Sequence, residues 1–377
     1  MKTLNIDSII PSFGIETVTE SNFPAYVTFK KQVEIPSPTY WYYRFLLFLI
    51  KVIVKIRLGI IGQSYKKYRS PKHLNNDEVE KVYNREADSY ERKHHLTTNF
   101  RDTWWRRQSG LDVISFVQEK SRMGEEVNLL DIATGVGLSI EEMLRVFRQY
   151  SVRLNITAID YNKEMLRVAN DIVLARIRKS GTLDGGNRLR FVRGDARSLS
   201  RASDGDGNTS EEFVKFKEGS VDCITIMFGI GGIHDFIDSY REQLKILKCG
   251  GIASINDMHK PVFDFSEKWP FYIGRKTRDI FSMMAWEIAA KPLALGTLWG
   301  WRDPSIDFHI LPYICISDQK NNKYYGFKQK YFSLNNEFWW FKLPVVSTAR
   351  IILEKVEIDR PEFERRNAIV ESIFASN

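Results

Sequence analysis

The feature that most constrains the fold is the signature of a strand, a tight turn and a helix at residues 127–147. The stretch VNLLDIATGVG is a short apolar run that ends in Asp131 and a turn containing Gly135 and Gly137, and LSIEEMLRVF follows with helical apolar spacing. This order places backbone N–H groups and a helix N-terminus at the carboxyl edge of a sheet, where open α/β sheets bind ligands. Glycines in the turn let the backbone approach a ligand where a Cβ would collide. Because a plain turn can look the same, the signature alone predicts the sheet but not the ligand.

Three later segments repeat the pattern of a strand followed by a polar or Gly-rich end. Residues 154–166 (LNITAIDYNKEML) contain a β-type run ending in Asp160, and residues 188–199 contain another ending in Gly194-Asp195-Ala196. Residues 220–235 hold the apolar run CITIMF, typical of a strand buried on both faces, and an amphipathic helix and LKCGG precede GIASINDM. The predicted fold class is therefore α/β, a Rossmann-like sheet with helices on both faces. An acid at the end of the second strand is the expected ligand of ribose hydroxyls, although a lone Asp there could instead cap the next helix.

The motifs VNLLDIATGVG, AIDYNKEML, FVRGDA, EGSVDCITIMFGI and LKILKCGG together resemble the class I methyltransferases that depend on S-adenosylmethionine (SAM). The resemblance is closest to the ubiquinone/menaquinone-biosynthesis C-methyltransferase family. The upstream stretch 82–107, VYNREADSYERKHHLTTNFRDTWWRR, is similar to that family's N-terminal element. The resemblance covers about residues 80–258. The chain departs from the family at Gly231-Gly232, where Arg-Asn is usual, and at Cys249, where Pro is usual.

The resemblance implies SAM as the cofactor and assigns residues to each part of it. The residues expected to border the methionine moiety are Asp131, Gly135 and Gly137; the ribose is assigned to Asp160, and the adenine to Asp195 and Ala196. Tyr90 and Arg106 would line the entrance of the site. No metal site is expected, because the three cysteines are too few and too scattered for a zinc site.

Methylation of a phenolic ring benefits from a base that removes the ring hydroxyl proton. His234 and His259 stand at expected strand ends on the ligand side and are the candidates for this base. The alternative is that each histidine is a structural hydrogen-bonding group.

Four parts are expected along the chain. They are a basic N-terminal segment at 1–79, the SAM-binding core at 80–258, an aromatic-rich insertion at 259–344, and a C-terminal part at 345–377 that completes the core. In the last part, VVSTARIILEKV is expected as a helix, and VEIDRPEF and NAIVESIFA as strands. The polar stretch 200–219 is expected as a surface loop.

The insertion is expected to bind the acceptor, because its aromatic residues, among them Trp299 and Trp340, suit a hydrophobic, ring-bearing substrate. The alternative is that these rings form the core of a subdomain or the interface of a homodimer.

The N-terminal segment carries most of the excess positive charge. Residues 1–75 hold eleven Lys and Arg against four acids, within a chain whose formal net charge is +8. Residues 41–61 are long enough to span a bilayer, but Lys51 at the midpoint makes a simple span costly, by roughly 2.5–3.5 kcal/mol per central cation. Because Arg44, Lys51 and Lys55 fall on one side of a helix, residues 40–62 are expected to lie in a membrane interface. The alternative is a core helix whose lysines reach solvent.

The expected protein is thus a SAM-dependent methyltransferase that acts on a hydrophobic small molecule or lipid such as a prenylated quinol. It would be peripheral on the cytoplasmic side of a membrane, or on an organelle membrane in a eukaryote, and would bind no nucleic acid. The alternatives are a methyltransferase for a protein or polar metabolite, and a non-catalytic scaffold with the same fold.

Overall fold

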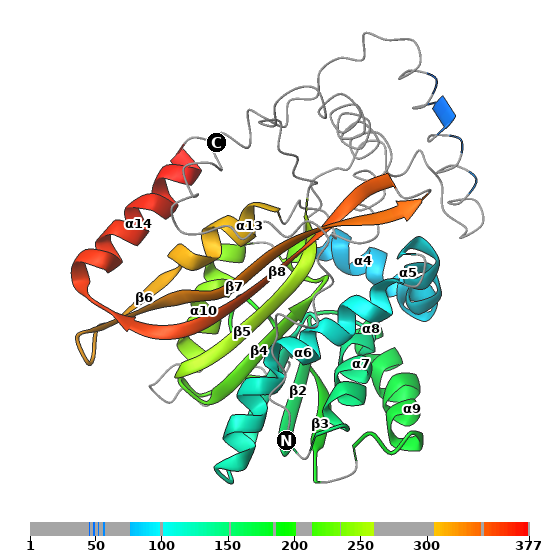
Figure 1. Cartoon of the computed structure of the whole chain (residues 1–377), viewed down its shortest axis with the longest axis horizontal. Coiled ribbons are helices and arrows are strands. Elements are labelled where there is room, and N and C mark those ends of the chain that lie inside the picture. Colours follow the sequence, from blue (N-terminus) through cyan, green and yellow to red (C-terminus); the bar gives the residue numbers. More distant parts are fainter. Residues whose placement is uncertain are drawn as a thin grey trace, which may run out of the picture.

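The computed structural model describes residues 76–98, 101–150, 152–183, 186–200, 213–233, 235–259, 305–340 and 343–375, together with five positions between 45 and 56. These residues contain one eight-stranded sheet with the order β3-β2-β1-β4-β5-β8-β7-β6 (Figure 1). The five strands of its first half are parallel: β1 (Val127–Ile132), β2 (Leu154–Asp160), β3 (Arg188–Arg193), β4 (Val221–Met227) and β5 (Leu247–His259). The remaining strands, β6 (Cys315–Asp318), β7 (Lys323–Trp340) and β8 (Leu343–Ile358), are joined in antiparallel pairs, and β8 lies antiparallel to β5.

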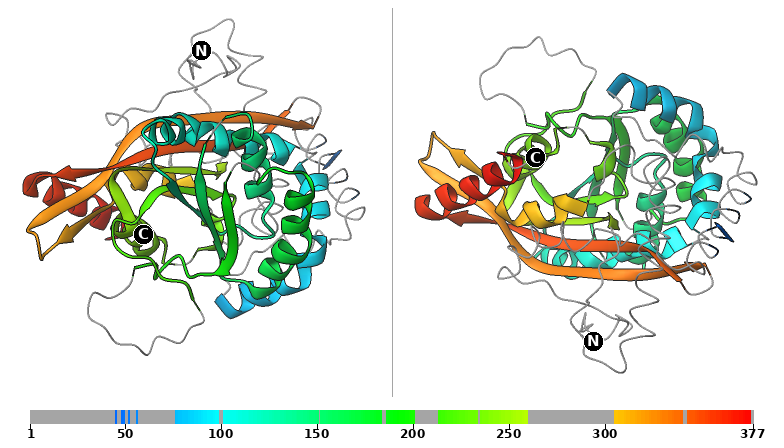
Figure 2. Two further views of the ribbon diagram at one scale, coloured as in Figure 1. Left: turned by 90° about the horizontal axis from the view of Figure 1, so that it is seen from below. Right: turned by 90° about the horizontal axis from the view of Figure 1, so that it is seen from above.

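Helices cover both faces of the sheet, as the sequence predicts. On one face, α6 (Arg101–Arg122), α7 (Leu138–Phe147), α8 (Lys163–Val168) and α9 (Leu174–Lys179) pack on alternate residues of β1 and β2. On the other face, α10 (Phe236–Ile246), α13 (Ser305–Ile310) and α14 (Arg360–Ala375) pack on β4, β5, β7 and β8. Two helices precede this core, α4 (Asn76–Glu86) and α5 (Tyr90–Thr98). Figures 1 and 2 show α4, α5 and α7–α9 gathered at the β1–β3 end of the sheet, with α14 at the opposite end.

The protein has two hydrophobic cores, one on each face of the sheet, because side chains along each strand alternate between the faces. In β1, Val127 and Leu129 face the first core, while Leu130 and Ile132 face the second, because successive residues of a strand point to opposite faces. Every residue of β4 is buried, as expected for a central parallel strand. The strand positions expected around residues 127, 154, 188 and 220, and the helix α10 between β4 and β5, are confirmed.

The expected secondary structure of residues 345–377 is wrong. The segment VVSTARIILEKV is strand β8 rather than a helix, and NAIVESIFA belongs to helix α14 rather than to a strand. Ala349, Ile351 and Leu353 are buried in the second core at every second position, which is the period of a strand and not of a helix. Helix α14 begins after Asp359, whose carboxylate accepts the backbone N–H of Glu362, and Pro361 in the first turn fits a helix start.

The boundary expected between insertion and core at residue 344 is also wrong. Residues 305–340 form α13, a 3-10 turn (Leu311–Tyr313), β6 and β7, and the two strands extend the main sheet. Phe308 of α13 and Phe327 and Phe332 of β7 belong to the second core. Antiparallel pairing of β7 with β8 satisfies backbone groups that β8 alone would leave exposed. Residues 260–304 lie outside the described part of the chain, as do residues 201–212 of the predicted loop.

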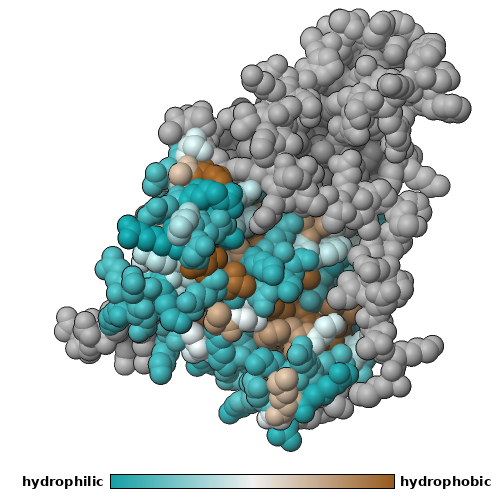
Figure 3. Space-filling model, turned by 60° about the vertical axis from the view of Figure 1, so that its left-hand side comes forward, coloured by the Kyte–Doolittle hydropathy of each residue, from teal (hydrophilic) through white to brown (hydrophobic). Residues whose placement is uncertain are grey.

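The described surface on the side that carries α14 is mainly hydrophilic, with small apolar areas between polar side chains (Figure 3). The buried apolar side chains form the two cores of the sheet. Among the residues that the structure describes, no helix combines the length and hydropathy needed to cross a membrane.

Candidate cofactor site

A cavity opens at the carboxyl edge of the sheet, where β1 lies between β2 and β4. The crossovers from these strands diverge to opposite faces at this point, which is where open α/β sheets bind their ligands. The cavity encloses about 860 Å³ of space, a volume that includes the solvent in its open mouth. Its floor is formed by residues at the ends of β1, β2 and β4, including Ala133, Asp160 and Phe228.

Asp160 is fixed at this floor by two backbone N–H groups. Its Oδ2 accepts from the Gly135 N–H at 2.8 Å, and its Oδ1 accepts from the Asn162 N–H at 2.8 Å. Burial raises the pKa of Asp160, and the N–H groups of Asn162, Gly135 and Tyr161 oppose that rise. Each carboxylate oxygen has two lone pairs and therefore has room for a further donor. A ribose, with two neighbouring hydroxyls, supplies such donors.

Asp195 lies at the end of the cavity that follows β3, together with Ala196 and Arg197. The Arg197 guanidinium donates to both carboxylate oxygens of Asp195, at 2.9 Å from Nε and 2.7 Å from Nη2. Although burial opposes ionisation, these bonds hold the pKa of Asp195 below its usual range. The carboxylate is therefore ionised and held in one orientation, as an acceptor for an exocyclic amino group requires.

Helices α4 and α5 cover the opposite side of the cavity with Val79, Tyr83 and Tyr90. Burial raises the pKa of Tyr90 to about 12 and that of Tyr83 well above its usual range, so both hydroxyls stay protonated at neutral pH. This cover is attached to the floor through Asn162, whose amide donates to the Asn84 side chain at 2.8 Å and to the Glu80 carbonyl at 3.2 Å. The cavity thus has an aromatic cover that is attached to its floor at Asn162, two residues after Asp160.

The backbone between the strands is shaped for close approach. A Cβ added to Gly229 would lie 2.4 Å from the Cβ of Ala133, so the turns after β1 and β4 touch only because residue 229 is glycine. Gly135 adopts φ +57° and has open space where a Cβ would stand. An open glycine turn, a fixed acid at Asp160 and a second fixed acid at Asp195 fit the methionine, ribose and adenine parts of SAM, respectively.

Of the residues that the sequence assigns to the cofactor, four line the cavity: Gly135, Asp160, Asp195 and Ala196. Asp131 does not line it, because its side chain is buried within the sheet and accepts a 2.7 Å hydrogen bond from Thr225. Burial raises the pKa of Asp131 to about 6, against the hydroxyls of Thr225 and Thr134. Gly137 does not line it either: with φ +88°, it starts α7 where a Cβ would lie 2.8 Å from the Phe191 ring. In the described structure, Asp131 and Gly137 therefore support the turn from beneath and do not face the cavity.

Of the two residues expected at the entrance of the site, Tyr90 lines the cavity and Arg106 does not. Arg106 is buried between α6 and α7, where it donates to Ser139 Oγ at 2.6 Å and lies 3.5 Å from Asp102. Its guanidinium also lies 5.6 Å from the centroid of the Phe228 ring, so it supports the cavity wall from behind.

Of the two histidines proposed as bases, the structure describes only His259. His234 lies outside the described residues. His259 is fully buried at the end of β5, with its Nε2 3.3 Å from Nε2 of His309, and it is not among the residues that line the cavity. Burial and the neighbouring His259 lower the pKa of His309 to about 3. Trp299 and the side chain of Trp340 also lie outside the described part.

Sequence reasoning missed several residues that shape the site, chiefly Tyr83, Asn162, Arg197 and Phe228. A signal was present for two of them. Asn162 stands directly after the second strand at a helix N-cap, and its Oδ1 accepts the Met165 N–H. Arg197 stands two residues after Asp195, but only the folded turn brings its side chain back to the carboxylate.

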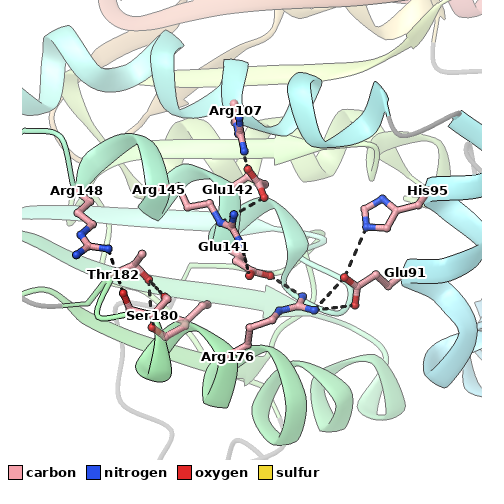
Figure 4. Close-up of polar contacts among 11 residues, drawn as sticks. Glu91, His95, Arg107, Glu141, Glu142, Arg145, Arg148, Arg176, Ser180 and Thr182 are labelled. Atoms are coloured by element: carbon pink, nitrogen blue, oxygen red, sulfur yellow. Dashed lines mark hydrogen bonds and ion pairs between the residues drawn. The ribbon is translucent and has the colours of Figure 1, made fainter.

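Charged residues join the cover to the helices behind the cavity (Figure 4). Arg176 of α9 binds Glu91 of α5 at 3.0 Å and Glu141 of α7 at 2.5 Å. His95 lies 3.0 Å from Asp102 and 3.6 Å from Glu91. The bonds to Asp102 and Glu91 raise the pKa of His95 to about 9.

This shift predicts a pH-dependent contribution of His95 to stability. Because the folded pKa of about 9 exceeds the unfolded value of about 6.5, the stabilisation is complete below the unfolded pKa and is lost as pH rises through 9. We expect His95→Gln to lower the free energy of unfolding by about 2 kcal/mol at pH 7 and by much less at pH 10. Urea titrations from pH 7 to 10 measure this difference. His309→Gln is the matched control, because a histidine with a folded pKa of about 3 stays neutral throughout that range. A pH-independent effect of His95→Gln would contradict the prediction.

Comparison with known proteins agrees with the site. The model of the ubiE/COQ5 methyltransferase family matches residues 71–285. A demethylmenaquinone methyltransferase of Porphyromonas gingivalis is 26% identical over 199 residues, which are 52% of this chain and 67% of that protein. The ubiquinone/menaquinone biosynthesis C-methyltransferase UbiE of Geotalea uraniireducens is 24% identical over 185 residues, 49% of this chain and 65% of that protein. The chain thus spans about two thirds of the length of these relatives.

Solved structures with similar folds include phosphoethanolamine N-methyltransferase 1 of Haemonchus contortus in complex with phosphoethanolamine and S-adenosylhomocysteine. It has a TM-score of 0.41 and 12% identity, and the match covers 81% of this chain and 56% of that one. A putative SAM-dependent methyltransferase of Methanococcus maripaludis has a TM-score of 0.39 and 14% identity, with 77% and 98% covered. Because both TM-scores lie below 0.5, the fold is assigned from the order of the strands in the sheet and from the position of the cavity. The family match spans more than half of the chain and includes every strand that forms the cavity floor. The chain therefore belongs to the ubiE/COQ5 methyltransferase family of SAM-dependent methyltransferases.

Proposed function

We propose that this chain transfers the methyl group of SAM to a hydrophobic, ring-bearing acceptor such as a prenylated quinol. The observation that carries the proposal is the cavity at the carboxyl edge of the sheet, which Asp160, hydrogen-bonded to the Gly135 N–H, and Asp195 both line. The acceptor class is suggested by the relatives, which are named as demethylmenaquinone and ubiquinone/menaquinone biosynthesis methyltransferases.

The residues of the chain perform positioning rather than covalent chemistry. When bound, SAM supplies an electrophilic methyl group, and its transfer needs an acceptor atom in line with the sulfonium bond. Asp160 and Asp195 hold the two ends of the nucleoside in fixed orientations. Tyr83 and Tyr90 cover the cavity and exclude water, which strengthens the electrostatic contacts inside.

The test is to incubate the full chain with methyl-labelled SAM and a total lipid extract from the source organism, followed by mass analysis of the labelled product. A labelled quinone or other ring-bearing lipid is the expected result. A parallel incubation with the aqueous fraction of the same cells tests the alternatives, because label in a protein or polar metabolite there, with none in the lipid extract, would replace the proposed acceptor with that class. Failure to bind S-adenosylhomocysteine in calorimetry would refute the methyltransferase function itself and leave the scaffold alternative.

We further propose that residues 40–62 place the enzyme on a membrane surface, on the cytoplasmic side or on an organelle membrane. Within this segment the structure describes Phe45, Phe48, Leu49, Val52 and Ile56, all of them helical. These five positions follow the spacing of one helix face, and four of the side chains are exposed, with Phe48 and Ile56 at 59% and 60%. Arg44, Lys51 and Lys55, on another side of the same helical wheel, lie outside the described residues. Exposed apolar residues with cations alongside fit an interfacial helix.

Flotation with liposomes measures this association. The protein is expected to float with anionic vesicles, and Lys51→Glu/Lys55→Glu is expected to float poorly, because each basic residue near such a surface contributes about 1 kcal/mol. High salt should weaken but not abolish binding, since apolar insertion persists. Lys179→Glu/Lys217→Glu, which changes two exposed lysines of the core, is the matched control. A protein that stays unbound with all vesicles would contradict the proposal, and resistance to both salt and alkali would indicate a span instead.

A further inference from the structure

A cluster of three side chains, one cation and two aromatic rings, stands at the nucleoside end of the cofactor cavity. Arg193 is the last residue of β3 and the register partner of Asp160 in β2. Tyr161 directly follows Asp160 and lines the cavity. Phe213 belongs to the segment that returns from the polar loop after β3. We call Arg193, Tyr161 and Phe213 the Arg193 cluster.

The three members of the Arg193 cluster contact one another closely. The rings of Tyr161 and Phe213 are stacked, with 5.4 Å between centroids and 24° between planes. The Arg193 guanidinium carbon lies 4.5 Å from the Phe213 centroid and 5.3 Å from the Tyr161 centroid. Its Nε also donates to the Tyr161 carbonyl at 2.9 Å. Because the Arg193 side chain is only 14% exposed, water screens its contacts with the rings little, and the Tyr161 ring is held in one orientation.

The segment that carries Phe213 is fixed to the sheet by its backbone. The Val214 N–H donates to the Arg193 carbonyl at 2.8 Å, and the Phe216 N–H donates to the Leu199 carbonyl at 2.8 Å. The side chains of Val214 and Phe216 pack against the second core. Phe213 is therefore placed against the cluster by paired backbone and buried neighbours, although it stands at the end of a polar loop.

Arg193 also contacts the cover of the cavity. Its Nη2 lies 3.5 Å from Glu80 Oε1 of α4. A second arginine makes a comparable contact: Arg167 of α8 has its Nη2 2.7 Å from Asp88 Oδ1, and both of these side chains are largely exposed. Arg167 is not among the residues that line the cavity. It therefore provides a matched control that separates attachment of the cover from any effect on the Tyr161 ring.

The place of the Tyr161 ring indicates which part of the cofactor it meets. Tyr161 lies next in sequence to Asp160, which is assigned to the ribose. Its ring centroid lies 5.9 Å from the guanidinium carbon of Arg197, which holds Asp195, the acid assigned to the adenine. A purine base has flat faces that stack on aromatic side chains. A ring that is already fixed loses little rotamer freedom when the base binds, so its contact contributes more to affinity.

We propose that Arg193 is a positioning residue for the adenine of SAM and acts through Tyr161, whose ring it holds together with Phe213 as a wall for the base. The inference rests on the cofactor of the proposed function and adds the residues that orient its base. Arg193 and Phe213 do not touch the base themselves. Their contribution to affinity is therefore present only while residue 161 carries an aromatic ring.

The test is a double-mutant cycle on the full chain, with the affinity for S-adenosylhomocysteine measured by calorimetry. Tyr161→Leu is expected to weaken binding about tenfold, because the stacking surface is lost. Arg193→Leu is expected to weaken it about fivefold in the wild-type background. In the Tyr161→Leu background, the same Arg193→Leu change should alter the affinity by less than about twofold, because the ring through which Arg193 acts is absent. A merely structural role of Arg193 predicts the same loss in both backgrounds.

Further variants test the same wall from its outer side and the contact with the cover. Phe213→Leu should weaken binding about threefold, whereas Phe213→Tyr keeps a ring and should bind as wild type does. Because Phe213 is only partly buried, this pair still tests the cluster should Arg193→Leu fail to fold. Arg167→Leu breaks the contact with Asp88 and should change the affinity by less than about twofold.

The outcomes separate this inference from the proposed function. Wild-type affinity in both Arg193→Leu and Phe213→Leu would overturn the inference. So would an Arg193→Leu loss that is equal in the two backgrounds, or an Arg167→Leu loss as large as that of Arg193→Leu. A wild type that binds no S-adenosylhomocysteine would instead overturn the proposed function on which the inference rests.

Discussion

Replacing Asp160 by alanine is expected to weaken the binding of S-adenosylhomocysteine by tenfold or more. The carboxylate supplies the acceptors for ribose hydroxyls, and a hydrogen bond to a charged group contributes about 1.5–3 kcal/mol. It also accepts the N–H groups of Gly135 and Asn162, so its loss releases both turns that border the cavity. Isothermal titration calorimetry measures the affinity directly.

The control for this variant is Asp171→Ala, which removes a carboxylate with 63% side-chain exposure that lies 3.9 Å from Arg167. That substitution should leave the affinity unchanged. If Asp160→Ala binds as tightly as wild type, the ribose contact assigned to Asp160 is wrong, whatever the fate of the rest of the site.

Replacing Asp112 by alanine is expected to lower the free energy of unfolding by about 3–5 kcal/mol, the largest stability effect anticipated for a single side chain. Asp112 is the ion-pair partner of Arg350, and both are buried between α6 and β8. It also accepts hydrogen bonds from Ser254 at 3.1 Å and from Asn256 at 3.2 Å. Its removal therefore leaves a buried guanidinium without a counter-charge, and it takes away the acceptor of the Ser254 hydroxyl and one of the acceptors of the Asn256 amide. Equilibrium unfolding in urea gives the difference.

Two further variants show whether the uncompensated charge is the cause. Asp112→Leu/Arg350→Met replaces the pair with apolar side chains and should recover most of the stability. Glu357→Ala breaks an exposed pair, with Lys323 at 2.8 Å, and should cost no more than about 1 kcal/mol. A loss in Asp112→Ala as small as that in Glu357→Ala would show that Arg350 is solvated rather than buried.

The sequence by itself determined the parallel half of the sheet and the position of the ligand site. Runs such as LNITAID and CITIMF are buried on both faces, and this pattern is local because a central parallel strand has no polar face. Asp160 is the last residue of β2, and Asp195 comes two residues after the end of β3, so their places at the carboxyl edge followed from the strand positions. Gly135 was identifiable for the same reason, since the turn it shapes is contiguous with β1.

Only the tertiary structure decided the antiparallel half and the packing behind the site. In VVSTARIILEKV, the helical and strand periods both place apolar residues on one side. The choice was made by the pairing of β8 with β7, which directly precedes it, and with β5, which lies far away in sequence. Asp131 and Gly137 share the motif of Gly135, yet one is turned into the sheet toward Thr225 and the other meets the Phe191 ring. Arg350 of β8 likewise pairs with Asp112 of α6, which lies 238 residues earlier in the sequence. Contacts of this kind depend on where distant segments pack, and no local pattern of residues encodes them.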